Sequence, residues 1–574
     1  MTLHHFMPAA RFSDLLGAPA MSALLLSVTT AAWSTDRNVG PGQTYLTIQG
    51  AIDASQDGDV IHVWPGTYTA GSGEAVALVS QRTITIASVG GPSATTIDGQ
   101  GARRGVVFDA CGEESEPCLL QGFTIRNTKP NVYFGTAVPT TLFTSGASVA
   151  CFGSHLTVSN CLIQSTNGVS DGALGGACCV GAAKSWSAAL AIEGCVITDC
   201  SALKGGAIGV ADEAPMHDTS LSLANCTVQG CNGTQDGGAI YARDDVSVTI
   251  TGSSFIDCTA MGGGGAICLE DTALGSPMAT ITAAGSTASR FTNCMAFGRG
   301  GALALTGSAT MDLSDCILDG NTSMLGGNAI LIDALKPHTP AFTAERCTFM
   351  NHAQIGPTTI PVGHGSLLYV ESRGTAHFTQ CEMIGNTGKG PLLDGWTRGI
   401  SLSACAASNN ANLSTMSRES LVAAQAGATV TLTSSLFQDN SSGLGAGTLL
   451  ASVPAGQQID ISGSYFCGVD GEVVAFEDVF GPEAGYVQSP EAFLTDKCPP
   501  CVGDVASPGP GNTVDITPDG HVDAYDLVAI LGAWGLSNDD VTGPLPLINL
   551  ANDTVGSDDL ALMLADWGSD CSEP

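Results

Sequence analysis

The sequence predicts an all-β protein, a right-handed parallel β-helix (a solenoid), followed by a small α-helical calcium-binding domain. Three observations lead to this prediction. A motif of alternating apolar residues and a Cys or Ser recurs about every 30 residues. Glycine pairs recur between these motifs, and the composition changes from Cys498 onward. We therefore expect a secretion signal over residues 1–35, the β-helix with an N-terminal capping helix over 36–496, and the calcium-binding domain over 497–574.

The repeat motif places apolar residues two positions apart, as in Leu190-Ile192-Cys195 and Leu221-Leu223-Cys226. This spacing indicates short strands that bury one face. Units of about 30 residues with three short strands cannot bury that face alone, so successive units must stack as coils. The Cys or Ser of successive units is assigned to positions 161, 195, 226, 253, 294, 316, 347, 381, 405, 435 and 464.

A second recurrence follows five residues later and predicts a second bend in each coil. It comprises Cys200, Cys231, Cys258, Asn321, Asn386, Asn410 and Asn440. Stacking places equivalent residues about 4.8 Å apart, so these side chains are expected to form internal ladders. Glycine pairs such as Gly264-Gly265 suit corners that need unusual dihedrals. The ladder thiols are expected to be buried and to form neither disulfides nor metal sites, whereas Cys111 and Cys118 are expected to pair.

These motifs resemble the right-handed β-helix proteins of the pectate-lyase-like superfamily over roughly residues 39–496. The resemblance implies a capping helix over Thr47–Ser55, a first strand over Val60–Trp64, and a turn over Pro65–Tyr68. Such a cap is needed because the first coil otherwise exposes a sheet edge and an open core. The Gly-Gly-Ala and Phe-x-x-Asn motifs, the latter at Phe437–Asn440, also resemble repeats of bacterial surface and autotransported β-helices.

The composition and the N-terminal segment indicate where the protein acts. The 19 basic and 54 acidic residues give a net charge of −35, which argues against a nucleic-acid partner. An apolar stretch at Ala20–Val28, followed by small residues at 30–32, is typical of a secretion signal. An uncleaved membrane anchor is the alternative, but Gly17 and Pro19 argue against it. We expect an extracellular or cell-surface protein without a membrane span in its mature chain.

Residues 515–526 have the spacing of a calcium-binding loop. The expected ligands are Asp515, Thr517, Asp519, the carbonyl of His521, Asp523 and Asp526, and Gly520 permits the sharp turn. Amphipathic helices closed by glycine are predicted after this loop and again 33 residues later. The second loop has Ile548 and Leu550 at ligand positions, so we expect one good Ca²⁺ site and one weak or lost site.

The final aspartate and the duplicated loop–helix arrangement resemble dockerin-like modules. That resemblance implies a cohesin-like partner or retention at the cell surface. The positions that correspond to the family's recognition residues are Ala524-Tyr525 and Ser557-Asp558, an unlike pair, which argues against a cohesin. The pattern Cys498-Pro-Pro-Cys501 indicates a structural role, with a bond from Cys571 to one of the two thiols as our hypothesis.

The predicted rod contains two motifs that are similar to those of known catalytic sites. Asp244-Asp245 and Gly363-His364-Gly365 are similar to polygalacturonase motifs, but about four coils, roughly 19 Å, are expected to separate them. Trp396, Arg398 or Tyr369 would suit a sugar-binding strip, and anchoring of a surface loop is the commoner role of such residues. We assign no catalytic residue.

We therefore expect a secreted, non-catalytic surface, adhesion or carbohydrate-binding protein that uses Ca²⁺ in its tail and has a polysaccharide or cell-surface component as partner. The alternative is an extracellular polysaccharide lyase or glycoside hydrolase, which follows from the fold alone.

Overall fold

The structure is a computed structural model that describes most of residues 34–462. Its gaps within that span are 72–74, 140–141, 165, 169–172, 183–185, 213–218, 273–275, 334–338, 355–364, 372, 396–398, 414–420, 425–428, 439, 443–450 and 453–457. Farther along, residues 464–467, 485–487, 493–495, 507–509 and 513–515 are described.

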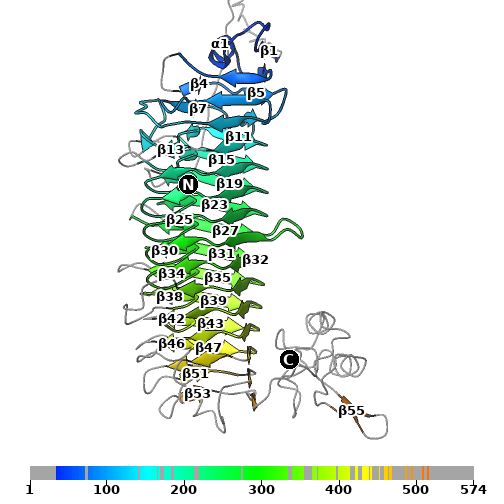
Figure 1. Cartoon of the computed structure of the whole chain (residues 1–574), viewed down its shortest axis with the longest axis vertical. Coiled ribbons are helices and arrows are strands. Elements are labelled where there is room, and N and C mark those ends of the chain that lie inside the picture. The colour runs from blue at the N-terminus through cyan, green and yellow to red at the C-terminus, as the bar shows by residue number, and fades with distance from the viewer. Residues whose placement is uncertain are drawn as a thin grey trace, which may run out of the picture.

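Three long parallel sheets and one narrow sheet run along a rod (Figure 1). Sheet A has 16 strands: β1 (Asp36–Val39), β2 (Val60–Val63), β5 (Thr85–Ser88), β8 (Cys118–Gln121), β11 (His155–Ser159), β15 (Ala188–Glu193), β19 (Thr219–Ala224), β23 (Val246–Thr251), β27 (Met278–Thr282), β31 (Thr310–Ser314), β35 (Ala341–Glu345), β39 (Thr375–Thr379), β43 (Ile400–Ser403), β47 (Val430–Thr433), β51 (Gln458–Asp460) and β53 (Gly485–Val487). Sheet B has 15 strands: β3 (Gly66–Tyr68), β6 (Thr95–Asp98), β9 (Thr124–Arg126), β12 (Leu162–Gln164), β16 (Val196–Thr198), β20 (Thr227–Gln229), β24 (Ser254–Ile256), β28 (Ser289–Thr292), β32 (Cys316–Asp319), β36 (Thr348–Met350), β40 (Glu382–Ile384), β44 (Ala406–Ser408), β48 (Leu436–Gln438), β52 (Tyr465–Cys467) and β54 (Phe493–Thr495).

Sheet C has 13 strands: β4 (Ala75–Ser80), β7 (Arg104–Asp109), β10 (Val149–Phe152), β14 (Cys178–Ala182), β18 (Ile208–Asp212), β22 (Ile240–Arg243), β26 (Ile267–Glu270), β30 (Leu303–Thr306), β34 (Ile330–Asp333), β38 (Leu368–Val370), β42 (Leu393–Gly395), β46 (Val422–Ala424) and β50 (Ala451–Ser452). The narrow sheet has ten strands: β13 (Asn167–Gly168), β17 (Ser201–Ala202), β21 (Asn232–Gly233), β25 (Thr259–Ala260), β29 (Met295–Ala296), β33 (Thr322–Ser323), β37 (Ala353–Gln354), β41 (Thr387–Gly388), β45 (Ala411–Asn412) and β49 (Ser441–Ser442).

From β11 to β50, each coil visits sheet A, sheet B, the narrow sheet and sheet C in turn, and then returns to sheet A. Among the described residues, the coils before β11 have no strand in the narrow sheet. One coil, for example, runs through β19, β20, β21 and β22 before β23 begins the next. Equivalent strands pair in parallel, as Leu221 with Val248 and Ile240 with Ile267 do. The predicted stack of coils is therefore confirmed.

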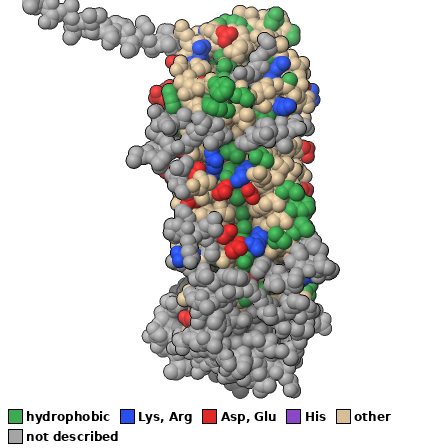
Figure 2. All heavy atoms as spheres, turned by 90° about the vertical axis from the view of Figure 1, so that its left-hand side faces the viewer, with side chains coloured by type: hydrophobic (Ala, Val, Ile, Leu, Met, Phe, Trp, Pro, Cys, Tyr) green, Lys and Arg blue, Asp and Glu red, His purple; other side chains and the backbone are tan. Residues whose placement is uncertain are grey.

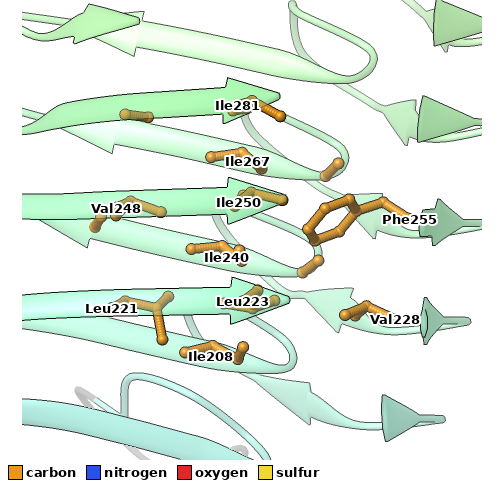
Figure 3. Packing of buried hydrophobic residues seen from close by; sticks show 14 of the residues in the cluster. Ile208, Leu221, Leu223, Val228, Ile240, Val248, Ile250, Phe255, Ile267 and Ile281 are labelled. Atoms are coloured by element: carbon orange, nitrogen blue, oxygen red, sulfur yellow. The ribbon is translucent and has the colours of Figure 1, made fainter. Parts of the chain in front are cut away.

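The interior is filled by the apolar residue of each alternating pair. Leu221, Leu223, Val248 and Ile250 from sheet A point into the rod, where they meet side chains of sheets B and C (Figure 3). Like residues stack on successive coils, and the rings of Phe255 and Phe291 lie parallel with centroids 4.9 Å apart. Because burial repeats coil by coil, a core of this kind grows with the rod.

The first predicted ladder lies at the bend between sheets A and B. The residue before most of the bend positions has a positive φ, such as Asn160 at 50° and Asn225 at 53°. That conformation turns the chain, and the next side chain bonds the main chain of the neighbouring coil: the Cys161 N–H donates to the Cys195 sulfur at 3.3 Å. Cys195 and Cys226 occupy adjacent coils, since β16 pairs with β20.

One assignment in this ladder is wrong. Ser289, and not Cys294, pairs with Cys316 and accepts a hydrogen bond from the Ser253 N–H. In this coil a loop that contains the Ala284–Thr287 bridge separates β27 from the bend, and it projects from the rod beside β27 (Figure 1). The extra residues displace Cys294 to the second bend.

The second ladder is continuous and contains a residue that the sequence pattern did not reveal. Its members are Cys200, Cys231, Cys258, Cys294, Asn321, His352, Asn386, Asn410 and Asn440. Asn386 Nδ2 donates to Asn410 Oδ1 at 2.9 Å, and Asn410 Nδ2 donates to Asn440 Oδ1 at the same distance. The 17 cysteines from Cys111 to Cys405 are free and buried. Cys111 and Cys118 lie side by side as free thiols, so the pairing expected for them is a contact and not a bond.

The glycine pairs form the corner that leads into sheet C. The first glycine of each pair has a positive φ, as in Gly264 at 68° and Gly300 at 71°. A Cβ on the second, such as Gly265, would collide with the main chain of Gly301 and Met295 on the next coil. Where glycines occupy both positions, the first supplies the dihedral angle and the second permits the close approach of two backbones. Later coils have Asn328 and Ser366 at the second position.

The N-terminal cap is a single helix, α1 (Ile48–Asp53). Thr47 is its N-cap and accepts from the Gly50 N–H at 3.1 Å. Ile48, Ala51 and Ile52 are buried against the core, so α1 covers the open end of the first coils (Figure 1). The cap is confirmed, but two neighbouring assignments were wrong: sheet A begins earlier, at β1, and Gly66–Tyr68 is strand β3 and not a turn.

At the other end, two short strands are described within 497–574. Strands β55 (Ser507–Gly509) and β56 (Thr513–Asp515) pair antiparallel. The two helices and the remainder of the calcium loop expected there lie outside the described residues. Among the residues that are described, α1 is the only α-helix, and no helix is long and apolar enough to span a membrane.

Candidate ligand-binding site

The outer face of sheet C carries a second apolar row. Register aligns Tyr241, Cys268, Ala304, Leu331 and Tyr369 on successive strands from β22 to β38. These five side chains point away from the main core and form a separate buried cluster. Nearer the N-terminus, the same cluster is covered by side chains of the segment before β10, among them Tyr133, Val138 and Leu142. From β22 onward, charged side chains border the row instead.

Lys204 is the centre of the first group of charged residues. Its Nζ lies 2.8 Å from Glu270 Oε2, 3.4 Å from Asp236 Oδ2 and 3.1 Å from the Tyr241 hydroxyl. The Tyr241 hydroxyl also donates to Glu270 Oε2. The ammonium group lies over the Tyr241 ring, 4.4 Å from its centroid. Residues 66 positions apart meet here because the coils between them stack in register.

These contacts fix the protonation states of the group. Burial and the Glu270 carboxylate raise the pKa of Tyr241 far above its usual range, so the phenol stays protonated. Burial opposes the charge of Lys204, but the hydrogen bond and charge of Glu270 outweigh it and raise the pKa of the lysine. Burial opposes the charge of Glu270 too, and Lys204 and Tyr241 lower its pKa overall. None of the three is therefore close to titrating near pH 7.

A second group repeats the arrangement farther along the rod. The Arg299 guanidinium lies 4.9 Å from the centroid of the Tyr369 ring and forms an ion pair with Glu371. Burial, followed by the charge of Glu371, raises the pKa of the neighbouring Asp333. On the face that includes β30, β34 and β38, acidic and basic side chains gather along a strip of hydrophobic ones (Figure 2). Both tyrosines are only 2% exposed, so neither ring offers a free face to a sugar.

The outer face of sheet A is different, because it carries hydroxyl groups in columns. Column one comprises Thr249, Thr280, Asp312, Thr343, His377 and Ser401, and column two comprises Thr251, Thr282, Ser314, Glu345, Thr379 and Ser403. Between the columns lies an open trough of about 400 Å³, which we call the sheet A trough. It is lined by Thr280, Asp312, Leu313, Ser314, Thr343, Ala344, Glu345, His377 and Thr379.

The walls of the trough carry charged and imidazole side chains, and main chain forms its floor. Asp312, Glu345 and His377 are exposed and form its walls, whereas Leu313 and Ala344 turn their side chains into the core and leave main chain as the floor. The Thr343 hydroxyl donates to Asp312 Oδ1, and His377 Nδ1 lies 2.6 Å from Ser401 Oγ. A ligand in the trough thus meets hydroxyls, carboxylate oxygens and an imidazole.

Of the two carboxylates in the trough walls, Glu345 has an ion-pair partner and Asp312 has none among the described residues. Arg346 holds Asp315 through two contacts of 2.8 and 2.9 Å and also contacts Glu345. The hydrogen bond from Arg346 lowers the pKa of Asp315, and Asp315 in return raises that of Arg346. Among the described residues, no cation lies within ion-pair distance of Asp312.

The structure separates the two polygalacturonase-like motifs, as expected. Asp244 follows the carboxyl end of β22, and Gly365 precedes the amino end of β38. The two therefore lie four strands apart in sheet C and at opposite ends of its strands. Asp244 is buried with a φ of 65° and accepts hydrogen bonds from the Thr272 N–H and hydroxyl. It ties one coil to the next and is no catalytic partner of the second motif. His364 lies outside the described residues.

Of the remaining predicted site residues, Tyr369 is covered and most of the others lie outside the described residues. Tyr369 does not line an exposed strip, because Arg299 covers its ring. Trp396 and Arg398 lie outside the described residues, and so do Thr517, Asp519, His521, Asp523 and Asp526, while Asp515 ends β56. Elsewhere in the described chain, no three His, Cys, Asp or Glu residues are placed to hold a metal. The sequence did not identify the Lys204 group or the trough. Burial holds the inward residues to a regular pattern, whereas nothing holds the outward residues to one.

The comparison with known families supports the fold. A family model described as a right-handed β-helix region matches residues 216–407, so this chain contains a right-handed β-helix. Among solved structures, the A-module of the Azotobacter vinelandii mannuronan C-5 epimerase AlgE4 is 11% identical, with 78% of this chain and 93% of that chain covered and a TM-score of 0.25. The PL6 family alginate lyase AlyGC is 10% identical, with 81% and 99% covered and a TM-score of 0.21. No curated protein matches the chain significantly.

Proposed function

We propose that this chain is a secreted, non-catalytic rod that binds carbohydrate in the sheet A trough and is displayed through a calcium-binding, dockerin-like tail. The observation that carries the proposal is the trough itself. It is open and extended, and hydroxyl, carboxylate and imidazole groups from four successive strands line it. Such groups both donate to and accept from sugar hydroxyls, and an open trough admits the middle of a long chain as well as its end.

The protonation states of the Lys204 group support a non-catalytic role. A general base needs a pKa near the working pH and access to a substrate proton. The pKa values of Tyr241 and Lys204 are raised and that of Glu270 is lowered, so each group keeps one state around neutrality. Their charges also satisfy each other within the fold, which suits a group that stabilises the stacking of three coils.

The display function rests on the sequence of the two ends. The signal-like residues 1–35 would direct export, and the loop at 515–526 would bind one Ca²⁺ through Asp515, Thr517, Asp519, His521, Asp523 and Asp526. The bound ion would order the tail, and the acidic tail would then dock on a cell-surface component. The unlike residues at its two recognition positions argue for a partner other than a typical cohesin.

Binding of the full chain to an immobilised panel of neutral and acidic polysaccharides tests the proposal. We expect at least one polysaccharide to retain the protein, and we expect Thr343→Val and His377→Ala to weaken retention about tenfold or more, the loss of one or two good polar contacts. Thr249→Ala is the matched control, because Thr249 lies in the same column outside the trough. Retention by none of the polysaccharides, or equal retention of both variants, would refute the proposal.

A polysaccharide-degrading enzyme is the second candidate, and one observation favours it. A lysine, a tyrosine and a glutamate meet within hydrogen-bond distance on one face of a β-helix, and clusters of titratable groups of this kind also occur at catalytic sites. A substrate that displaced Glu270 from Lys204 and Tyr241 would free a cation and a proton donor there.

A further inference from the structure

We infer that the sheet A trough selects a neutral glycan chain that lies along the rod axis, and that it excludes chains of uronic acids. This inference rests on the proposed carbohydrate binding and adds to it the class and the direction of the ligand. It follows from three features of the trough: the strands that line it, the charges that surround it, and the hydroxyl groups of its walls.

The first feature sets the direction. Thr280, Asp312, Thr343 and His377 come from β27, β31, β35 and β39, and register places them one above another. The trough therefore runs across the strands, parallel to the rod axis, over about 14 Å at 4.8 Å per coil. One coil is about as long as one pyranose unit in an extended glycan, so successive sugars meet equivalent positions on successive coils. Three or four sugar units fill the described trough.

The second feature sets the charge of the ligand. Asp312 faces the trough without an ion-pair partner among the described residues, and Glu345 stands on the opposite wall. Arg346, which follows Glu345 in the chain, is engaged by Asp315 and Glu345. A ligand carboxylate would thus lie close to like charges, and the residues that line the trough include no Lys or Arg. Like charges in contact oppose binding. The net charge of −35 adds a long-range repulsion of polyanions.

The third feature favours hydroxyl groups on the ligand. A carboxylate accepts several hydrogen bonds. Asp312 accepts from Thr343 and Glu345 contacts Arg346, and their other acceptor sites suit further donors, which neutral sugars supply in abundance. Threonine and serine hydroxyls at Thr280, Ser314, Thr343 and Thr379 complement them as donors and acceptors. The lining contains no Trp, Tyr or Phe on which a sugar ring would stack. Binding at one trough is therefore expected to be weak and to depend on chain length.

Calorimetric titration of the full chain with oligosaccharides of two to six units tests the inference. The probes are neutral gluco-, manno-, galacto- and xylo-oligosaccharides and, at matched lengths, oligogalacturonates and oligomannuronates. At least one neutral series should bind, with affinity that rises up to three or four units and then levels off. The uronate series should bind at least tenfold more weakly. In the isosteric double variant Asp312→Asn, Glu345→Gln, that difference should shrink to less than threefold.

The outcomes separate this inference from the proposed function. Uronates that bind the wild-type trough as tightly as neutral chains, with loss of binding in His377→Ala, would overturn the selectivity and leave carbohydrate binding in place. A neutral series whose affinity does not depend on length would overturn the axial direction. Absence of binding by every probe would overturn the proposed function together with the inference. Thr249→Ala again serves as the control outside the trough.

Discussion

Single residues decide how the coils join at the bends. At most of the bends a residue with positive φ is followed by a side chain that bonds the main chain of a neighbouring coil. The sequence predicted the ladders from the recurrence of Cys, Ser and Asn, but missed His352 because histidine breaks that pattern. Ser289 was missed for another reason: a loop lengthens its coil, and Cys294 nearby has the expected residue type. Residue type thus predicted the ladder positions correctly only where the length of the coil stayed constant.

His352 makes the stability of the rod dependent on pH. The imidazole is completely buried, and burial lowers its pKa from 6.5 to about 3. Below pH 6.5 the unfolded chain takes up a proton that the folded chain refuses until about pH 3. The free energy of unfolding therefore falls as the pH drops through this window. For each pH unit, the equilibrium constant between folded and unfolded chain falls by up to a factor of about ten. We therefore expect a lower free energy of unfolding at pH 5 than at pH 7.

Urea unfolding of the wild type and of His352→Asn at pH 7 and pH 5 measures this effect. We expect the variant to lose less stability than the wild type on acidification, because Asn does not titrate and continues the ladder from Asn321 to Asn386. His377→Asn, at an exposed position, is the control and should behave as the wild type does. An identical loss of stability in the wild type and His352→Asn would show that His352 does not take part.

Whole elements follow from steric limits at the corners and from the need for a cap. The sequence predicted α1 correctly, since Thr47 is a good N-cap and the apolar residues Ile48 and Ile52 lie on one side of a short helix. It missed β1, because one strand before the helix offers no repeat to recognise. The glycine pairs were predicted as corners, and the structure adds a reason for the second glycine in pairs such as Gly264-Gly265 and Gly300-Gly301.

Replacement of that second glycine tests the close approach at the corner. Gly265→Ala should lower the free energy of unfolding by more than about 2 kcal/mol, because the new methyl group meets the main chain of the next coil and the backbones must move apart. Gly71→Ala is the matched control, since nothing lies within 4 Å of a Cβ there. Thermal unfolding compares the two. Equal stability of both variants would contradict the account of the corner.

At the scale of the molecule, stacking in register brings distant residues together. Lys204 meets Glu270, and Asp312 meets Thr343, only because the intervening coils have particular lengths. One sequence shows the period of the inward residues, which burial constrains, and so it predicts the fold. The outward residues are not held to a period, and the sequence therefore did not identify the Lys204 group or the trough.

The tail gives a prediction for the complete chain. A Ca²⁺ titration should detect one tight site, because only the loop at 515–526 has oxygen ligands at all the required positions. Asp519→Ala should abolish that site, whereas Asp553→Ala in the degraded second loop should leave it unchanged. Two equally tight sites in the wild type would contradict this prediction.

The central claim is that the rod binds a glycan without altering it. Mass spectrometry of neutral and uronate oligosaccharides after prolonged incubation with the purified chain tests this claim most directly. We predict an unchanged distribution of lengths and masses for every oligosaccharide, including those that bind. New reducing or unsaturated ends, formed by the wild type and lost in Lys204→Ala, would contradict the claim and identify the chain as an enzyme.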